Sequence, residues 1–421
     1  MTKANQYIDS KLIINSVKLL TASGVGQIVA VVVYPFVTRL YSPDELGTLS
    51  LFLAIVGVGA IMASAQYENA VVIEKKSSDA ATAVDLCLAL NVLCSAVVAI
   101  VCAFLTFAGL LPEQWRLTAN LIAPLIFLSS LGYVLSFWWN RNDRYGKSAA
   151  YNVVHSVTNN VSKVALGFAG WHKWGLVISA FIGQAVGVLT ILFRIRTNGG
   201  EILRFRFGDI VAAARRHKAF ALYSLPHKLI NVLTVNMPIF VMSAAFDMVQ
   251  VGFFALALNV AMRPMWAFAR ALNQVLFQRV GENESRDESS ALLLNSICRR
   301  MVLVFVPLVV VLWMLLPWLT EVFFGTEWVA ASGLLRMMLP WMVCSFMALS
   351  LNFVPSVYGR QKAAFVVECV GFAVNVAALS VGAFVVRNVV VCVSILSMVN
   401  CLYSVGQICW YLMLAAKRNT Q

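Results

Sequence analysis

Charged side chains are scarce in this chain. Asp, Glu, Lys and Arg make up 12% of its 421 residues, whereas hydrophobic residues make up 60%. A soluble domain usually contains about 25% charged residues. The shortage extends along the whole chain, so the composition excludes a soluble globular enzyme, a disordered protein and a fibrous protein. It favours a polytopic membrane protein.

Several motifs of enzymes and metal sites are also absent. The nine cysteines form no CxxC pair and their number is odd, so we expect neither a disulfide framework nor a zinc site. The sequence lacks a P-loop, an HExxH pair and a GxSxG elbow. We therefore expect no catalytic residues, no bound metal and no cofactor, with H⁺ or Na⁺ considered only as a coupling ion.

Long apolar stretches recur from one end of the chain to the other. Stretches of about 20 residues are long enough to cross the hydrocarbon core of a bilayer as helices, and we predict about twelve of them. Barrel strands are excluded because the runs are too long and unbroken. The predicted spans are 12–38, 46–72, 81–106, 118–138, 149–170, 175–193, 221–245, 250–277, 291–316, 333–356, 364–386 and 388–413. The predicted fold class is an all-α polytopic membrane protein.

The net charge of +13 has an explanation in membrane topology. If the N-terminus is cytoplasmic, most Lys and Arg residues fall in cytoplasmic segments, as is usual for membrane proteins. We therefore predict a multi-pass protein with both termini in the cytoplasm, and no nucleic acid partner. The first apolar run is too long for a signal peptide and has no cleavage site, so we expect the N-terminus to be retained.

The chain divides near its midpoint. The longest cytoplasmic connection, 194–220, is basic and partly amphipathic. Residues 46–72 align without gaps on residues 251–277, which places Gly47 over Gly252. We predict an N-terminal bundle of six helices (1–193), a basic linker (194–220) and a C-terminal bundle of six helices (221–421). Two halves related by a pseudo-twofold axis are typical of transporters, with the substrate site between them.

Polar residues inside four predicted spans are spaced so that each set lies on one helical face, which we call a polar stripe. A charged residue within a span costs about 2.5 to 3.5 kcal/mol, so it normally faces a cavity or a partner. The cations on these stripes are Arg263, Arg270, Lys228 and Lys163. Lys18 lies in the first predicted span, displaced from the polar stripe of that span. The amides are Asn259, Asn273, Asn231, Asn159 and Gln27.

These stripes predict a cationic, water-filled lumen. The four stripes carry no carboxylate, and Lys and Arg together would attract phosphate or acidic sugars, with Arg adding bidentate recognition of phosphate. In the alternative interpretation each cation pairs with a carboxylate or with carbonyl oxygens and only fixes helix packing. Lys18 could equally extend to the cytoplasmic edge of the bilayer.

Three carboxylates also fall within predicted spans. Glu68, Asp85 and Glu368 are candidates for a gate or for cation coupling, because a buried carboxyl group can hold a proton near neutral pH. The alternative for Glu68 is a salt bridge, and for Asp85 an interfacial or paired position near the end of its span.

Three segments resemble a known family. They are VTRLYSPDELGTLSLF at 37–52, QYENAVVIEK at 66–75, and residues 224–266. Together with the number of spans, they are similar to the oligosaccharide (O-antigen, Wzx-type) flippases of the MOP exporter superfamily. The resemblance implies two six-helix bundles with pseudo-twofold symmetry around a V-shaped cavity that alternates its opening.

The same resemblance implies a function in polysaccharide and lipopolysaccharide biosynthesis. The expected substrate is an undecaprenyl-diphosphate-linked oligosaccharide, moved from the cytoplasmic to the periplasmic leaflet of the bacterial inner membrane by ion-gradient coupling. The expected partners are this substrate, membrane lipid, a polysaccharide polymerase and a chain-length regulator. The chain departs from a generic pattern because its first span has no obvious buried Asp.

Two other functions remain as alternatives. A cation-coupled exporter of drugs or small solutes, from the same superfamily, would need acidic lumen residues, and the polar stripes have none. An integral-membrane polysaccharide polymerase would need larger outer loops with catalytic residues. The outer segments are short, and the longest are 106–117 and 317–332.

Overall fold

The computed structural model describes Gly26 and residues 28–142, 144–195, 206–285 and 290–417. Regular structure in these residues is entirely helical, without strands. Ten helices in this part are long and apolar enough to span a membrane, and a shorter apolar helix covers Ile28–Leu40. The predicted class, an all-α polytopic membrane protein, is therefore confirmed.

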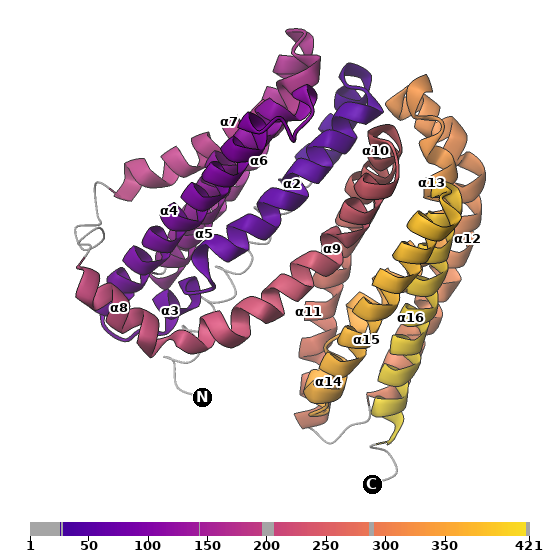
Figure 1. Cartoon of the computed structure of the whole chain (residues 1–421). Helices are drawn as coiled ribbons and strands as arrows, with labels where there is room; N and C mark the ends of the chain where they lie inside the picture. Colours follow the sequence, from indigo (N-terminus) through magenta and orange to yellow (C-terminus); the bar gives the residue numbers. More distant parts are fainter. Residues whose placement is uncertain (1–25, 27, 143, 196–205, 286–289, 418–421) are drawn as a thin grey trace. The chain divides into compact units, whose positions relative to one another are not determined.

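The helices from α2 to α7 follow one another with short connections (Figure 1). They are α2 (Pro43–Ser64), α3 (Glu68–Ile73), α4 (Ser77–Phe107), α5 (Glu113–Arg141), α6 (Tyr145–Phe168), α7 (His172–Ile195) and α8 (Phe207–Arg216). Of the first predicted span, 12–38, residues 12–25 and 27 lie outside the described residues. The second to sixth predicted spans each coincide with a helix, although the second is interrupted.

The second half begins with a π-helical turn, η1 (Phe220–Ser224), that continues into α9 (Leu225–Ala245). The remaining elements are α10 (Met248–Ala257), η2 (Leu258–Met262), α11 (Arg263–Ser285), α12 (Ala291–Phe324), η3 (Thr326–Trp328), α13 (Ala331–Leu351), α14 (Val354–Val357), α15 (Gln361–Ser380), η4 (Val381–Val386) and α16 (Val389–Lys417). The seventh to twelfth predicted spans all coincide with helices.

The chain forms two compact units. Unit 1 contains Leu49–Asn236 with the described residues up to Tyr41, and unit 2 contains Ser42–Thr48 with the described residues from Met237 onward. The chain therefore passes from one unit to the other three times: between Tyr41 and Ser42, within α2 and within α9. The predicted division into 1–193, 194–220 and 221–421 stays a prediction.

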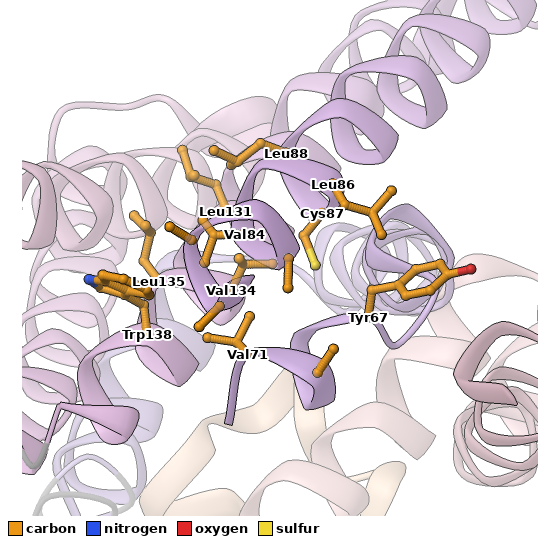
Figure 2. Packing of buried hydrophobic residues seen from close by; sticks show 14 of the residues in the cluster. Tyr67, Val71, Val84, Leu86, Cys87, Leu88, Leu131, Val134, Leu135 and Trp138 are labelled. Carbon is orange, nitrogen blue, oxygen red and sulfur yellow. The ribbon is translucent and has the colours of Figure 1, made fainter. Parts of the chain in front are cut away.

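Each unit has its own apolar core. In unit 1, side chains of α3, α4 and α5 converge, and Figure 2 shows Val84, Leu131 and Val134 between Val71 and Leu88. The amphipathic helix α8 joins this core through buried Ala213. In unit 2 a second core draws on α11, α12, α13 and α16, and it includes Leu276, Leu294, Met301, Leu351 and Tyr411.

The second predicted span, 46–72, is not one continuous helix, so this part of the prediction is wrong. Helix α2 ends at Ser64, and Ala65 and Gln66 take left-handed backbone conformations with φ values of 48° and 62° before α3 begins. The guanidinium of Arg141 donates hydrogen bonds to the carbonyl oxygens of Val71 (2.8 Å) and Glu74. These bonds satisfy carbonyl groups that the short helix leaves without an intrahelical donor.

The eighth predicted span also differs from expectation. We expected one continuous α-helical face from Asn259 to Asn273, but the turn from Leu258 to Met262 is π-helical. A π-helical turn changes the angle between successive side chains, so Asn259 does not share an α-helical register with the residues that follow. Such turns occur frequently at functional sites.

Candidate functional site

The two arginines of the predicted lumen lie on α11. Arg263 and Arg270 are seven positions apart, which is close to two helical turns, so they share one face, and both are exposed. The sequence between Arg263 and Gln278 contains no acidic residue. The α-helical part of the predicted stripe thus presents two guanidinium groups on a face without carboxylates.

The two asparagines predicted on the same stripe make local hydrogen bonds. Asn259, in η2, donates its side-chain amide to the carbonyl oxygen of Ala255 (2.8 Å). Asn273 donates its amide to the carbonyl oxygen of Leu349 (3.1 Å) and to the side-chain oxygen of Asn352 (2.8 Å). Asn273 therefore holds α11 against the end of α13.

The two lysines lie in unit 1. Lys163 is half-buried on α6, and its backbone carbonyl accepts a hydrogen bond from the hydroxyl of Tyr41 (2.8 Å). Asn159, one turn earlier, lies where α6 approaches α7, and a Cβ at Gly183 would be 2.6 Å from the Cβ of Asn159. Lys228 is half-buried near the start of α9, where Asn231 is exposed.

The predicted lumen residues thus divide between the two units. Lys163, Lys228, Asn159 and Asn231 belong to unit 1, whereas Arg263, Arg270, Asn259 and Asn273 belong to unit 2. Lys18 and Gln27 lie outside the described residues. A lumen that all these side chains share stays a prediction.

The three candidate carboxylates have different environments. Glu68 is fully buried at the start of α3, and Asp85 is buried on α4. Glu368 is exposed on α15. One oxygen of Glu68 accepts a hydrogen bond from the side-chain amide of Gln66 (2.9 Å), a contact that the sequence did not indicate.

A charged cluster at α8 was also missed at the sequence level. The carboxylate of Glu74 lies 2.6 Å from Nε2 of His217 and 3.1 Å from Nη1 of Arg216, which is also 3.6 Å from Asp79. The hydrogen bond with His217, and then the contact with Arg216, hold the pKa of Glu74 below its ordinary value against the opposing effect of burial. This cluster attaches the end of α8 to the connection between α3 and α4. The basic and amphipathic character of 194–220 was the available signal.

Comparisons with known proteins give a consistent result. The family described as "Polysaccharide biosynthesis protein" matches residues 36–333. A relative from Rhizobium meliloti, the succinoglycan biosynthesis transport protein ExoT, is 23% identical over 333 residues, which cover 76% of this chain and 62% of that protein. The chain therefore matches less than two thirds of the length of this relative.

Solved structures share the fold. The lipid II flippase MurJ, in an inward closed conformation, has a TM-score of 0.72 at 12% identity, covering 96% of this chain and 87% of its own. An inward-facing multidrug resistance transporter of the MATE family, in the MOP superfamily, has a TM-score of 0.68 at 13% identity, covering 96% of both chains. These similarities confirm the MOP-type fold that the sequence predicted.

Proposed function

The chain belongs to the polysaccharide biosynthesis protein family, and we propose that it is a flippase for lipid-linked oligosaccharides. It moves an undecaprenyl-diphosphate-linked repeat unit, of O-antigen or a related polysaccharide, from the cytoplasmic to the periplasmic leaflet of the bacterial inner membrane. Transport proceeds by alternating access and is coupled to an ion gradient. The family match over residues 36–333 and the MOP-type fold support this proposal.

The physical problem in such transport is solvation. A glycan and a diphosphate lose their hydrogen bonds to water on entering hydrocarbon, and each unpaired polar group costs several kcal/mol. A protein can lower this barrier by offering a polar, cationic surface to the headgroup while the lipid tail stays in the bilayer. The polar stripes of Lys163, Lys228, Arg263 and Arg270 would supply that surface.

The observation that carries the proposal is the paired arrangement of Arg263 and Arg270. Both guanidinium groups are exposed on one face of α11, and no acidic residue lies between them. Arginine binds phosphate oxygens through two parallel hydrogen bonds, which suits a diphosphate better than a cationic drug. This chemistry favours a lipid diphosphate over the substrates of a drug exporter.

We expect the double variant Arg263→Ala and Arg270→Ala to lose transport while still inserting in the membrane. A hydrogen bond to a charged group contributes about 1.5 to 3 kcal/mol. Since about 1.4 kcal/mol corresponds to a tenfold change, each arginine should account for roughly 10- to 100-fold in transport rate. The measurement is transfer of a lipid-linked oligosaccharide in proteoliposomes, alongside surface polysaccharide in cells.

A matched control is available on the same helix. Arg279 is exposed on α11, nine positions after Arg270 and hence on the opposite face. Arg279→Ala removes the same charge from the same helix and should leave transport unchanged. Normal transport in the double variant, or an equal loss in Arg279→Ala, would contradict the assignment of this face to the substrate.

A further inference from the structure

Glu68 occupies an unusual position in unit 1. It is the first residue of α3, and its exposed fraction is 0%. Tyr67 precedes it, and the two residues before Tyr67, Ala65 and Gln66, have left-handed backbone conformations. The core around α3 is apolar, with Val71, Cys87 and Val134 near one another in Figure 2. An ionised carboxylate in such surroundings costs several kcal/mol unless it is paired and fully hydrogen-bonded.

The carboxyl group of Glu68 is only half satisfied. Its Oε1 accepts a hydrogen bond from Nε2 of Gln66 (2.9 Å), but its Oε2 is buried and has no hydrogen-bond partner among the described residues. Lys228 on α9 attracts the carboxylate electrostatically, and Ser64 interacts with it from the end of α2. The described ion pairs of the chain do not include Glu68. No contact cation therefore compensates a negative charge here.

The other titratable groups near Glu68 do not change this result. Cys87 on α4 and Tyr133 on α5 both interact electrostatically with Glu68, and Tyr67 precedes it in the chain. All three are neutral until they ionise and then become negative, so none of them supplies a positive charge to Glu68. A protonated carboxyl group satisfies these conditions better than a carboxylate.

The backbone beside Glu68 is in a sparsely populated conformation. Positive φ values at non-glycine residues such as Ala65 and Gln66 cost about 1 to 3 kcal/mol each and occur frequently in switch regions. The side chain of Gln66 binds Glu68, so the same residue carries the unusual backbone and contacts the carboxyl group. At the other end of α3, Arg141 binds the carbonyl oxygens of Val71 and Glu74. A change of charge at Glu68 would therefore act on a short helix held at both ends.

We propose that Glu68 is a proton-binding site of this protein, protonated in the conformation described here and ionised in a conformation that exposes it. A metal cation requires several oxygen ligands, and the described residues contain no group of three or more acidic, His or Cys side chains that could hold one. A single carboxyl group with one hydrogen-bond partner suits a proton, and the Na⁺ gradient described below tests the alternative. Its link to transport rests on the proposed function, whereas proton binding itself does not.

The test compares Glu68→Gln with the wild-type full-length chain in lipid bilayers. Gln keeps the shape of the side chain but cannot ionise. Infrared difference spectra recorded across a pH titration detect protonated carboxyl groups without any substrate. We expect one protonated carboxyl signal of the wild type to disappear in Glu68→Gln and to remain in Glu113→Gln, a control at an acid whose side chain is 90% exposed. Unchanged titration spectra in Glu68→Gln would overturn the proposal.

A second variant serves if Glu68→Gln fails to insert. Gln66→Asn introduces a residue that tolerates the left-handed conformation. The shorter side chain of Asn withdraws the amide from Glu68. A donor hydrogen bond favours the ionised carboxylate, so its loss should move the carboxyl titration to higher pH. A titration midpoint that stays in place, or moves to lower pH, would overturn the proposal.

Transport measurements connect the site to the proposed function. In proteoliposomes, a pH gradient should accelerate oligosaccharide transfer by the wild type and by the exposed control Glu113→Gln. The acceleration should be at least tenfold smaller in Glu68→Gln. Acceleration by a Na⁺ gradient alone would overturn the identity of the ion. If the wild type moves no lipid-linked oligosaccharide, the proposed function fails, and the infrared titration still decides whether Glu68 binds a proton.

Discussion

Glu74 is the residue through which pH should act on the position of α8. The hydrogen bond with His217 lowers the pKa of Glu74 from its ordinary value of 4.5. A carboxylate with a lowered folded-state pKa stabilises the folded structure above the unfolded-state value, and this contribution is lost as the pH falls through the lowered value. We expect Glu74→Gln to lower Tm at pH 7. The difference from the wild type should shrink below pH 4.5.

The control for this prediction is an exposed ion pair. Glu113 lies 3.7 Å from Arg116, and their side chains are 90% and 44% exposed. An exposed pair contributes about 0 to 1 kcal/mol, so Glu113→Gln should change Tm little at any pH. Parallel Tm curves for Glu74→Gln and the wild type from neutral to acidic pH would contradict the role of this cluster.

Other single residues show why the sequence alone could not assign the cations. Arg336 lies in a predicted span, yet it donates a hydrogen bond to the carbonyl oxygen of Trp313 (2.8 Å). Its guanidinium carbon also lies 4.6 Å from the centre of the Trp313 ring. Arg141 binds the carbonyl oxygens of Val71, in α3, and of Glu74, just after it. Helical spacing predicts which residues share a face, but it contains no information about a hydrogen-bond partner on another element.

At the scale of elements, the approach of α2 to α10 depends on two glycines within unit 2. A Cβ at Gly47 would lie 2.1 Å from the carbonyl oxygen of Met248, and a Cβ at Gly252 would lie 1.8 Å from that of Pro43. When the register that places Gly47 over Gly252 is continued three residues before the aligned stretch, Pro43 falls over Met248. The two close contacts therefore exchange partners in the register of the internal repeat.

We expect Gly252→Ala to destabilise the protein, because the added methyl group meets backbone atoms that no side-chain rotation can remove. Overpacking typically costs about 1 to 3 kcal/mol, and the effect is measurable as a lower Tm in detergent. Gly57→Ala, on α2 with no atom within 4 Å of the added Cβ, is the matched control. It should be neutral or slightly stabilising, since Ala favours helix by about 1 kcal/mol. Equal Tm values for the two variants would contradict the close approach.

The positions of the helices could be predicted from the sequence, but their interruptions could not. Apolar runs predict spans because each helix must cover the same hydrocarbon thickness. The break after Ser64 uses Ala65 and Gln66 rather than Gly or Pro, so it carries no local signal. A search for a period of 3.6 residues also passes over the π-helical turn at Leu258–Met262.

At the scale of the whole molecule, the predicted fold class is confirmed, whereas the shared lumen stays a prediction. The fold class follows from composition and length, which are properties of the entire chain. The lumen requires Lys163 and Lys228 of unit 1 to act together with Arg263 and Arg270 of unit 2. Within each helix the spacing predicts a shared face, but a joint site also depends on long-range packing that no spacing along one helix encodes.

Orientation in the membrane is a property of the whole molecule, and the distribution of basic residues predicts it. Basic residues gather in alternate connections, so these connections should face the cytoplasm, with both termini on that side. The exposed residues Lys75 and Arg360 lie in connections predicted to face the cytoplasm. The exposed residues Glu113 and Glu327 lie in connections predicted to face the opposite side of the membrane. Single cysteines at these four positions, in a chain whose nine native cysteines are replaced by alanine, report the side directly.

An impermeant thiol reagent added to intact cells should label Glu113→Cys and Glu327→Cys. It should label Lys75→Cys and Arg360→Cys only after the membrane is opened. The pattern follows because each helix between two labelled positions crosses the bilayer once and reverses the side. The reverse pattern would place the basic connections outside, and the direction proposed for flipping would then have no topological support. Labelling of all four positions in intact cells would instead contradict the assigned spans between them.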